Sequence, residues 1–281
     1  MPSGESVRGG SGVMTTEFVT SKDGTRIAFD RTGEGPPVIL VAGATANRSF
    51  PNPLSALLVP NFTVFNYDRR GRNESGDTPP FAVEREIEDI EALIEEAGGS
   101  AYAYGISSGA VVALEAAASG LAITKLALYE APLILDGSRP PVPADYVRQL
   151  QESVSSGHPG DAVEIFMTKA VGIPAEFVAG MRSQPMWPAL EAVAHTIAYD
   201  GAFMEGLMFG KPIPPERAKR WASISVPTLV IDGGASEPFM HGGAEALAKV
   251  LPNARRDTLD GQTHDVNPEV LAPVLVEFFK A

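Results

Sequence analysis

The sequence predicts an α/β protein with a mostly parallel sheet flanked by helices. Short runs of apolar and β-branched residues alternate along the chain with segments whose apolar residues recur at helical spacing. Several of the strand-like runs are apolar throughout, which is typical of strands that are buried on both faces. The 281 residues, 44% of them hydrophobic, are enough for a substantial core.

Seven segments have the pattern of short strands. The clearest is VILV, residues 38–41, because a continuous apolar run of this length indicates a buried parallel strand. The predicted strands are residues 25–29, 38–41, 62–68, 101–104, 124–129, 228–231 and 256–259.

Four further segments are predicted helices. Within residues 82–97, Val83, Ile87, Ile90 and Ile94 recur at 3.6-residue spacing, so one face of this helix is apolar. The same segment carries seven acids and one base, and we expect this charge to lie largely on a solvated face. The predicted helices are residues 82–97, 111–118, 242–251 and 268–280.

Residues 133–226 interrupt this alternation. They contain no convincing buried strand, and the proline-rich sequences SRPPVP and KPIPPE bracket several helical stretches. Because the strand pattern then resumes, we predict a helical insertion between two parts of one core, residues 14–132 and 227–281. The Gly- and Ser-rich residues 1–13 are expected to form a flexible tail.

Charge and cysteine content exclude several function classes. The chain has 22 Lys and Arg against 35 Asp and Glu, a net charge of −13, and we therefore expect neither nucleic acid nor a membrane surface as a partner. With no cysteine, the chain has no disulfide, thiolate metal site or cysteine nucleophile. No apolar stretch approaches the roughly 20 residues of a membrane span, and the first dozen residues lack the apolar segment of a secretory signal. The expected location is the cytoplasm.

The clearest chemical motif is GISSG, residues 105–109, directly after a predicted strand and before a predicted helix. A serine at the centre of such a tight turn needs small residues two positions away on either side, because a Cβ there would collide with the turn. The N-terminus of the following helix offers unpaired N–H groups to a developing oxyanion. This context predicts that Ser107 is a nucleophile.

His264 is the candidate general base, because it lies between the last predicted strand and the last predicted helix. Of the other histidines, His158 and His195 belong to the insertion, and His241 lies near the start of a predicted helix. The histidines lack metal-ligand spacing, and no glycine-rich loop has phosphate or dinucleotide spacing. We therefore predict no metal and no cofactor.

Five segments, in this order, resemble the α/β-hydrolase fold family: VILVAGATANRS, FNYDRRGRNESG, YAYGISSGA, VPTLVIDGGASEP and GQTHD. The resemblance implies an α/β-hydrolase fold in which residues 133–226 form a helical cap. It also implies a cofactor-free serine hydrolase, esterase- or lactonase-like, with Ser107 as nucleophile and His264 as general base. The backbone N–H groups of Ala44 and Ser108 would then form the oxyanion hole.

The segment DRRGRNESG, residues 68–76, has the composition of a turn. In the family this loop organises the neighbouring turns. We therefore expect Asp68, Arg69 and Ser75 to hold loops in place rather than to contact substrate.

The acid of the catalytic triad stays open among three carboxylates. Family members often place an Asp in a G-x-x-D turn, and this chain has Ser236 at that position. Glu130 is favoured because a carboxylate that ends a nearly apolar strand is costly to bury without a partner, and a protonated histidine is a natural one. Asp232, which precedes two glycines, and Glu237 are the alternatives. Asp232 is also typical of an Asp that forms a turn, and Glu237 is also typical of a solvated surface residue.

Methionines and aromatic residues gather in the insertion and favour an apolar acyl or alcohol group over a sugar or polyphosphate. They are Met167, Met181, Met186, Met204, Met208, Phe166, Phe177, Trp187, Phe203 and Phe209. We predict cleavage of a small to medium ester, thioester or lactone through an acyl-enzyme. The alternatives are other Ser/His chemistry on the same fold (carbon–carbon bond hydrolysis, perhydrolysis or a biosynthetic cyclisation) and a non-catalytic ligand-binding protein. No oligomeric state is predicted.

Overall fold

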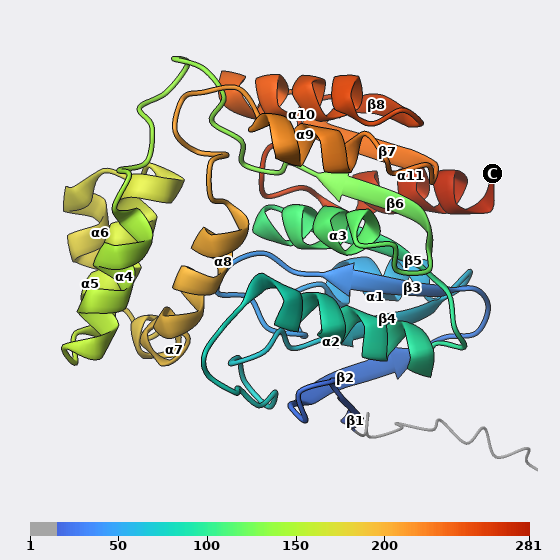
Figure 1. Cartoon of the computed structure of the whole chain (residues 1–281), viewed down its shortest axis with the longest axis horizontal. Coiled ribbons are helices and arrows are strands. Elements are labelled where there is room, and N and C mark those ends of the chain that lie inside the picture. The colour runs from blue at the N-terminus through green and yellow to red at the C-terminus, as the bar shows by residue number, and fades with distance from the viewer. Residues whose placement is uncertain (1–15) are drawn as a thin grey trace, which may run out of the picture.

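The structure, a computed structural model, describes residues 16–281, so the predicted tail, residues 1–13, lies outside the described residues. The described strands form one eight-stranded sheet in the order β1-β2-β4-β3-β5-β6-β7-β8. Helices cover both faces of this sheet (Figure 1). The chain thus has the predicted α/β architecture.

All seven predicted strands are confirmed, with ends that differ by a few residues. The pairs β1–β2 and β2–β4 are antiparallel, and all other neighbouring strands are parallel. The prediction missed β1, an edge strand in which only Val19 is buried. The strands are β1 (Glu17–Thr20), β2 (Arg26–Thr32), β3 (Pro37–Val41), β4 (Thr63–Tyr67), β5 (Ala101–Ile106), β6 (Ile123–Tyr129), β7 (Thr228–Gly233) and β8 (Ala254–Leu259).

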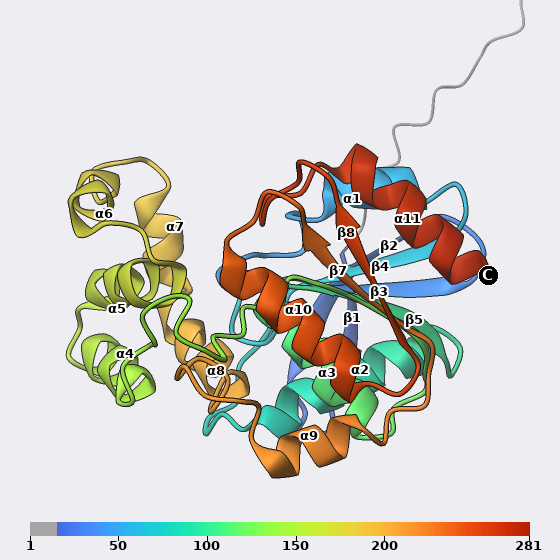
Figure 2. The same ribbon diagram turned by 90° about the horizontal axis from the view of Figure 1, so that it is seen from above.

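Each face of the sheet has its own layer of helices (Figure 2). One layer contains α2 (Val83–Glu96), α3 (Ser108–Ala118) and α10 (Pro238–Val250), and the other contains α1 (Asn52–Leu58) and α11 (Pro268–Lys280). In β3, Ile39 and Val41 pack into the first layer, and Val38 and Leu40 pack into the second. This two-sided burial explains why the strand is apolar at every position.

The chain between β6 and β7 contains no strand and is helical. Its helices are α4 (Tyr146–Ser155), α5 (Pro159–Ile165), α6 (Ala175–Met181), α7 (Trp187–Ala192), α8 (Ile197–Phe203) and α9 (Pro215–Trp221). Helices α4 to α7 form a lobe beyond the carboxyl ends of the strands (Figures 1 and 2). Helix α9 instead lies against α3, where Arg217 and Arg220 pair with the buried Glu115. We refer to residues 133–226 as the insertion.

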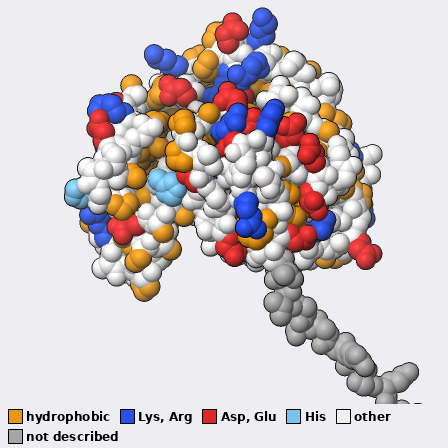
Figure 3. Space-filling model, turned by 60° about the horizontal axis from the view of Figure 1, so that its bottom comes forward, with side chains coloured by type: hydrophobic (Ala, Val, Ile, Leu, Met, Phe, Trp, Pro, Cys, Tyr) orange, Lys and Arg blue, Asp and Glu red, His pale blue; other side chains and the backbone are white. Residues whose placement is uncertain are grey.

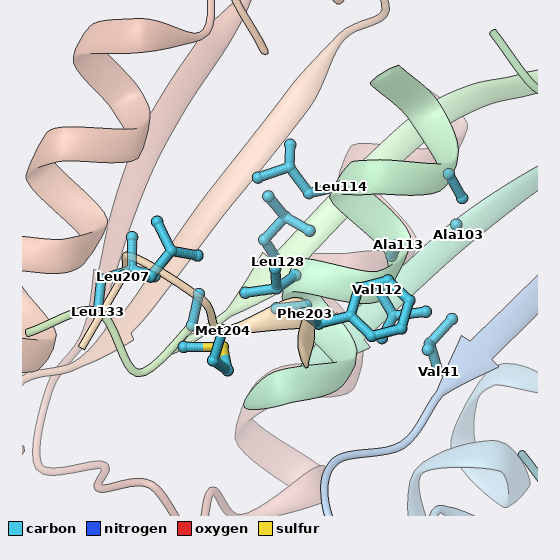
Figure 4. Close-up of a cluster of buried hydrophobic side chains, with 14 of the residues drawn as sticks. Val41, Ala103, Val112, Ala113, Leu114, Leu128, Leu133, Phe203, Met204 and Leu207 are labelled. Carbon is cyan, nitrogen blue, oxygen red and sulfur yellow. The ribbon is translucent and has the colours of Figure 1, made fainter. Parts of the chain in front are cut away.

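The end of α8 packs into the core beside α3 and β6 (Figure 4). Phe203 and Leu207 of the insertion are fully buried in the same hydrophobic cluster as Val112 of α3 and Leu128 of β6. Burial of large apolar side chains is the main favourable term in folding, so this contact fixes the insertion to the sheet through α8.

The acidic face of α2 is not wholly solvated, and the expectation is wrong for two of its seven acids. Glu86 and Asp89 are each 1% exposed. They form buried ion pairs with Arg69 and Arg70, which follow β4. Of the remaining acids of α2, three are exposed and two are half-buried. The face of the molecule in Figure 3 has acidic and basic side chains interspersed. Within residues 16–281, no helix has the length and apolar character that a membrane span requires.

Candidate active site

The candidate site lies at the carboxyl edge of the sheet, where the order of the strands reverses. After β3 the chain adds β4 on one side, and it then returns to add β5 on the other side. The loops after β3 and β5 therefore leave in opposite directions, and such a switch point creates a crevice that binds ligands in open α/β sheets. Ala44 follows β3 and Ser107 follows β5, so both lie at this crevice.

Ser107 has a strained backbone between β5 and α3, with φ 59° and ψ −132°. Such a conformation costs a non-glycine residue about 1–3 kcal/mol and persists only where its surroundings enforce it. Here the Ser107 N–H donates to the Tyr129 carbonyl at 2.9 Å. A Cβ on Gly105 would lie 2.5 Å from the Gly109 carbonyl oxygen, and one on Gly109 would lie 2.3 Å from the Val41 carbonyl oxygen. These close approaches are the physical reason for the two glycines of the motif.

Two backbone N–H groups near Ser107 are available to an anionic oxygen. Ser108 is the first residue of α3, so its N–H has no acceptor within the helix. Ala44 follows Gly43, where a Cβ would lie 3.0 Å from the Ser107 Cβ, so the missing side chain lets this loop approach the serine. In residues 16–281 neither N–H has a hydrogen-bond acceptor. Both residues line one cavity with Ser107.

His264 contacts Glu130. Its Nδ1 lies 2.8 Å from Glu130 Oε2, and the other carboxylate oxygen accepts the Gly233 N–H at 2.7 Å. Burial would raise the pKa of Glu130, but the hydrogen bonds from His264 and Gly233 hold it below its usual value. The carboxylate is therefore ionised and fixes the ring with Nδ1–H toward Glu130. His264 also lines the cavity with Ser107, although the Ser107 hydroxyl makes no hydrogen bond to it or to any other described residue.

Asp232, the second candidate acid, has other partners. Its fully buried carboxylate accepts two hydrogen bonds from Arg256, each 2.8 Å long, and one from Thr258 at 3.1 Å. It also lies 2.5 Å from Nδ1 of His241. These contacts direct Asp232 toward His241 rather than His264 and hold its pKa below the usual value against the effect of burial.

Glu237, the third candidate acid, is exposed at the start of α10 and lines the cavity, with no hydrogen bond to His264. Ser236, at the G-x-x-D position, also lines the cavity. Among the three candidate carboxylates, the structure therefore brings only Glu130 into contact with His264.

The cavity around Ser107 has a volume of about 770 Å³ and a mostly apolar lining. Of the ten insertion residues expected to roof it, Phe166, Met204 and Met208 line it. Phe203 is buried in the core instead, and Phe177 is 66% exposed. The lining from the body of the protein includes Phe50, Phe239 and Met240, which the sequence analysis missed.

Among the charged residues of the cavity, Arg139 and Asp200 were also missed. Arg139 is the one Lys or Arg among the described cavity residues, and its guanidinium lies 4.7 Å from the centre of the Phe239 ring. Asp200 of α8 also lines the cavity, although its residue is 4% exposed. Neither residue belongs to a motif or a periodic pattern, so no sequence signal identifies it.

The loop after β4 holds its neighbours in place, as expected. The Ser75 hydroxyl donates to the Asp68 carbonyl at 2.6 Å, and the Asp68 carboxylate accepts the Arg48 N–H at 2.8 Å. Arg69 is 1% exposed, pairs with Glu86 and Asp200, and does not line the cavity. No group of three or more His, Asp or Glu residues within residues 16–281 has the geometry to hold a metal ion.

Comparison with known proteins gives one family and several solved structures. The model described as "Alpha/beta hydrolase family" matches residues 38–274. An alpha/beta hydrolase from Sphaerobacter thermophilus DSM 20745 is 56% identical, with a TM-score of 0.85 over 94% of this chain and 100% of that one. A thermophilic esterase from Thermogutta terrifontis (24% identity, TM-score 0.72, covering 95% of this chain and 98% of that one) has the same fold. An enol-lactonase from Burkholderia xenovorans LB400 also has this fold (19% identity, TM-score 0.66, covering 94% of this chain and 100% of that one).

A curated relative matches over a shorter segment. BpoC of Mycobacterium tuberculosis, described as a non-heme bromoperoxidase, is 32% identical over 92 residues. The match covers 32% of this chain and 35% of the relative, so the chain matches about a third of the length of that protein.

Proposed function

Because the chain belongs to the alpha/beta hydrolase family, we propose that it is a cofactor-free serine hydrolase that cleaves a small to medium apolar ester, thioester or lactone. The observation that carries the proposal is the contact between His264 and Glu130 at the cavity that Ser107 also lines. A nucleophile, a base and a residue that orients the base are the parts that acyl transfer needs.

In the proposed mechanism, Ser107 Oγ attacks the carbonyl carbon of the substrate while Nε2 of His264 takes the serine proton. Glu130 holds Nδ1–H and stabilises the imidazolium that forms. The carbonyl oxygen becomes an oxyanion, which accepts hydrogen bonds from the N–H groups of Ala44 and Ser108. His264 then protonates the leaving alcohol, thiol or lactone oxygen, and the acyl group remains on Ser107.

Deacylation uses the same groups. His264 removes a proton from water, the resulting hydroxide attacks the acyl carbon, and the Ser107–acyl bond breaks as the serine regains its proton. The cavity of about 770 Å³ with its apolar lining supports an apolar acyl or alcohol group of small to medium size. We assign the insertion as the cap that roofs this group, through Phe166, Met204 and Met208.

Perhydrolysis is a second candidate, favoured by the similarity to a protein described as a bromoperoxidase. Hydrogen peroxide would replace water as the nucleophile that attacks the acyl-enzyme. The products would be a peracid and free Ser107, so acylation would be unchanged.

Stopped-flow kinetics with p-nitrophenyl butyrate tests the proposal. We expect a burst of nitrophenolate equal to the enzyme concentration and then steady turnover, with both lost in Ser107→Ala and turnover strongly reduced in His264→Ala. His158→Ala, which changes an exposed histidine of the insertion, should behave like wild type. A wild-type protein with neither burst nor turnover over a panel of acyl chain lengths would instead be a ligand-binding member of the fold. Peracid formation on addition of peroxide would favour the second candidate.

A further inference from the structure

A buried carboxylate of the insertion forms part of the cavity wall, in contact with Ser108. Asp200 of α8 accepts hydrogen bonds from Arg69 and Arg72, each 2.6 Å long, and from the Ser108 hydroxyl at 2.7 Å. The side chains of the two arginines are each 1% exposed, and that of Asp200 is 6% exposed. Three separate parts of the chain therefore meet at Asp200: the insertion, the loop after β4 and the first turn of α3.

The same two arginines extend to the loop after β3. Arg72 donates to the Gly43 carbonyl at 2.6 Å, and Arg69 donates to the Ala42 carbonyl at 3.3 Å. The Gly43 carbonyl belongs to the same peptide bond as the N–H of Ala44, which is available beside Ser107, and Ala42 lies one residue before Gly43. Asp200 is thus linked to both proposed oxyanion donors, directly to Ser108 and through the arginines to the Ala44 loop.

The charges of this cluster are balanced. Glu86 of α2 forms two hydrogen bonds to Arg69, of 2.7 and 2.9 Å, so two guanidinium groups face two carboxylates. Burial would raise the pKa of Asp200, but Arg69 and Arg72 hold it below its usual value, and the carboxylate is ionised. Buried ion pairs contribute little net stability compared with apolar packing. Stability alone is therefore a weak reason for placing four charges here.

We propose that Asp200 is a positioning residue for the oxyanion hole. It fixes the distance between the N–H groups of Ala44 and Ser108, so that the hole has its working geometry only when the insertion is seated on the body. The inference rests on the proposed function, because it concerns the same acyl-transfer site. Oxyanion donors act on charge that develops in the transition state, so their displacement lowers kcat more than it changes KM.

Ser108→Ala tests the direct link, because it removes the hydroxyl contact but keeps the backbone N–H and both arginine pairs. We expect kcat for p-nitrophenyl butyrate to fall about tenfold, less than the roughly 10²–10³-fold loss on removing a whole donor, with KM nearly unchanged. Ser108→Thr, which restores a hydroxyl, should recover much of the rate. Ser55→Ala is the matched control, since it removes a buried hydroxyl that bonds to Asn66 and to the Pro51 carbonyl and does not line the cavity.

Inhibition by a trifluoromethyl ketone distinguishes a positioning role of the Ser108 hydroxyl from a role in stability alone, because the ketone binds through the oxyanion hole. Ser107 Oγ adds to the ketone carbon, its proton passes to His264, and the carbonyl oxygen becomes an oxyanion in the hole. Ser108→Ala should weaken this inhibitor by about the factor lost in kcat. It should leave the inhibition constant of the corresponding secondary alcohol, which forms no oxyanion, unchanged.

Asp200→Asn and Glu86→Gln test the role of the carboxylate itself. Each removes one negative charge from the cluster, but only Asp200 contacts Ser108. We expect both to lower Tm and only Asp200→Asn to lower kcat strongly. Equal losses of kcat in the two variants would overturn the inference, as would an unchanged kcat and an unchanged ketone affinity in Ser108→Ala. Should Asp200→Asn fail to fold, Ser108→Ala decides. A wild-type protein without turnover would count against the proposed function itself.

Discussion

Nδ1 of His264 lies 2.8 Å from Oε2 of Glu130, across 134 positions of sequence. Glu130 reaches this position because its backbone turns left-handed directly after β6, with φ 44°. The Gly233 N–H of the neighbouring strand β7 fixes its other oxygen. The carboxylate is therefore held from two sides before any substrate binds, and this preorganisation underlies the predictions below.

The first prediction separates the two buried carboxylates. Glu130→Gln should lower kcat for a p-nitrophenyl ester by roughly 10²–10⁴-fold, because a neutral amide neither holds the productive tautomer nor stabilises the imidazolium. Asp232→Asn should leave kcat nearly unchanged and lower the free energy of unfolding by about 1–3 kcal/mol, because Arg256 loses its charged partner. The opposite pattern would assign the acid to Asp232.

The second prediction concerns the strain at Ser107. Ser107→Gly and Ser107→Ala should both be inactive, but the glycine variant should be more stable by about 1 kcal/mol, because glycine adopts this backbone conformation at little cost. Urea unfolding of the two variants measures the difference. Equal stabilities would mean that the turn stores no strain at this residue.

The third prediction concerns Gly109. In Gly109→Ala the new Cβ would lie 2.3 Å from the Val41 carbonyl oxygen and 2.6 Å from that of Ala42, so the backbone of β3 or α3 must shift. We expect a loss of about 1–3 kcal/mol or more in stability, together with a large loss of kcat. Gly180→Ala is the control, because that helical glycine has open space around it and should gain up to about 1 kcal/mol. Retention of wild-type kcat in Gly109→Ala would contradict the role given to the close approach.

The fourth prediction concerns acid stability. The pKa of Glu130 lies below its ordinary value of 4.5 in the folded state. As the pH falls, Glu130 is protonated in the unfolded chain near pH 4.5, before it is protonated in the folded protein. The stability that the ionised carboxylate contributes is therefore complete above pH 4.5 and is lost as the pH falls through the lower folded pKa. Glu130→Gln should therefore reduce the loss of unfolding free energy on acidification below about pH 4.5. An unchanged slope would show that this carboxylate is not linked to folding.

The sheet could be predicted because its signals are local. A strand such as residues 38–41 is buried on both faces, and its composition records that burial directly. Helix α11 begins and ends where the pattern predicts, at Pro268 and Lys280, because a proline starts it and its apolar face is continuous. The edge strand β1 has no such signal, since three of its four side chains lie outside the core.

The candidate site could be predicted only where chemistry and local structure coincide. Ser107 has the glycines that its turn requires, and His264 lies between the last strand and the last helix of the chain. By contrast, the partners of Glu130, Asp232 and Asp200 come from distant segments, and a single sequence does not record which carboxylate meets which cation. The same long-range pairing removes Glu86 from the solvated face of α2.

Covalent labelling with a fluorophosphonate probe, followed by peptide mapping, tests the central claim most directly. Ser107 Oγ should displace fluoride from phosphorus, with one probe per chain, on the peptide that contains residues 105–109. Ser107→Ala should show no adduct, and Glu130→Gln should label more slowly at the same residue. An adduct on any other residue, or labelling that survives in Ser107→Ala, would contradict the account.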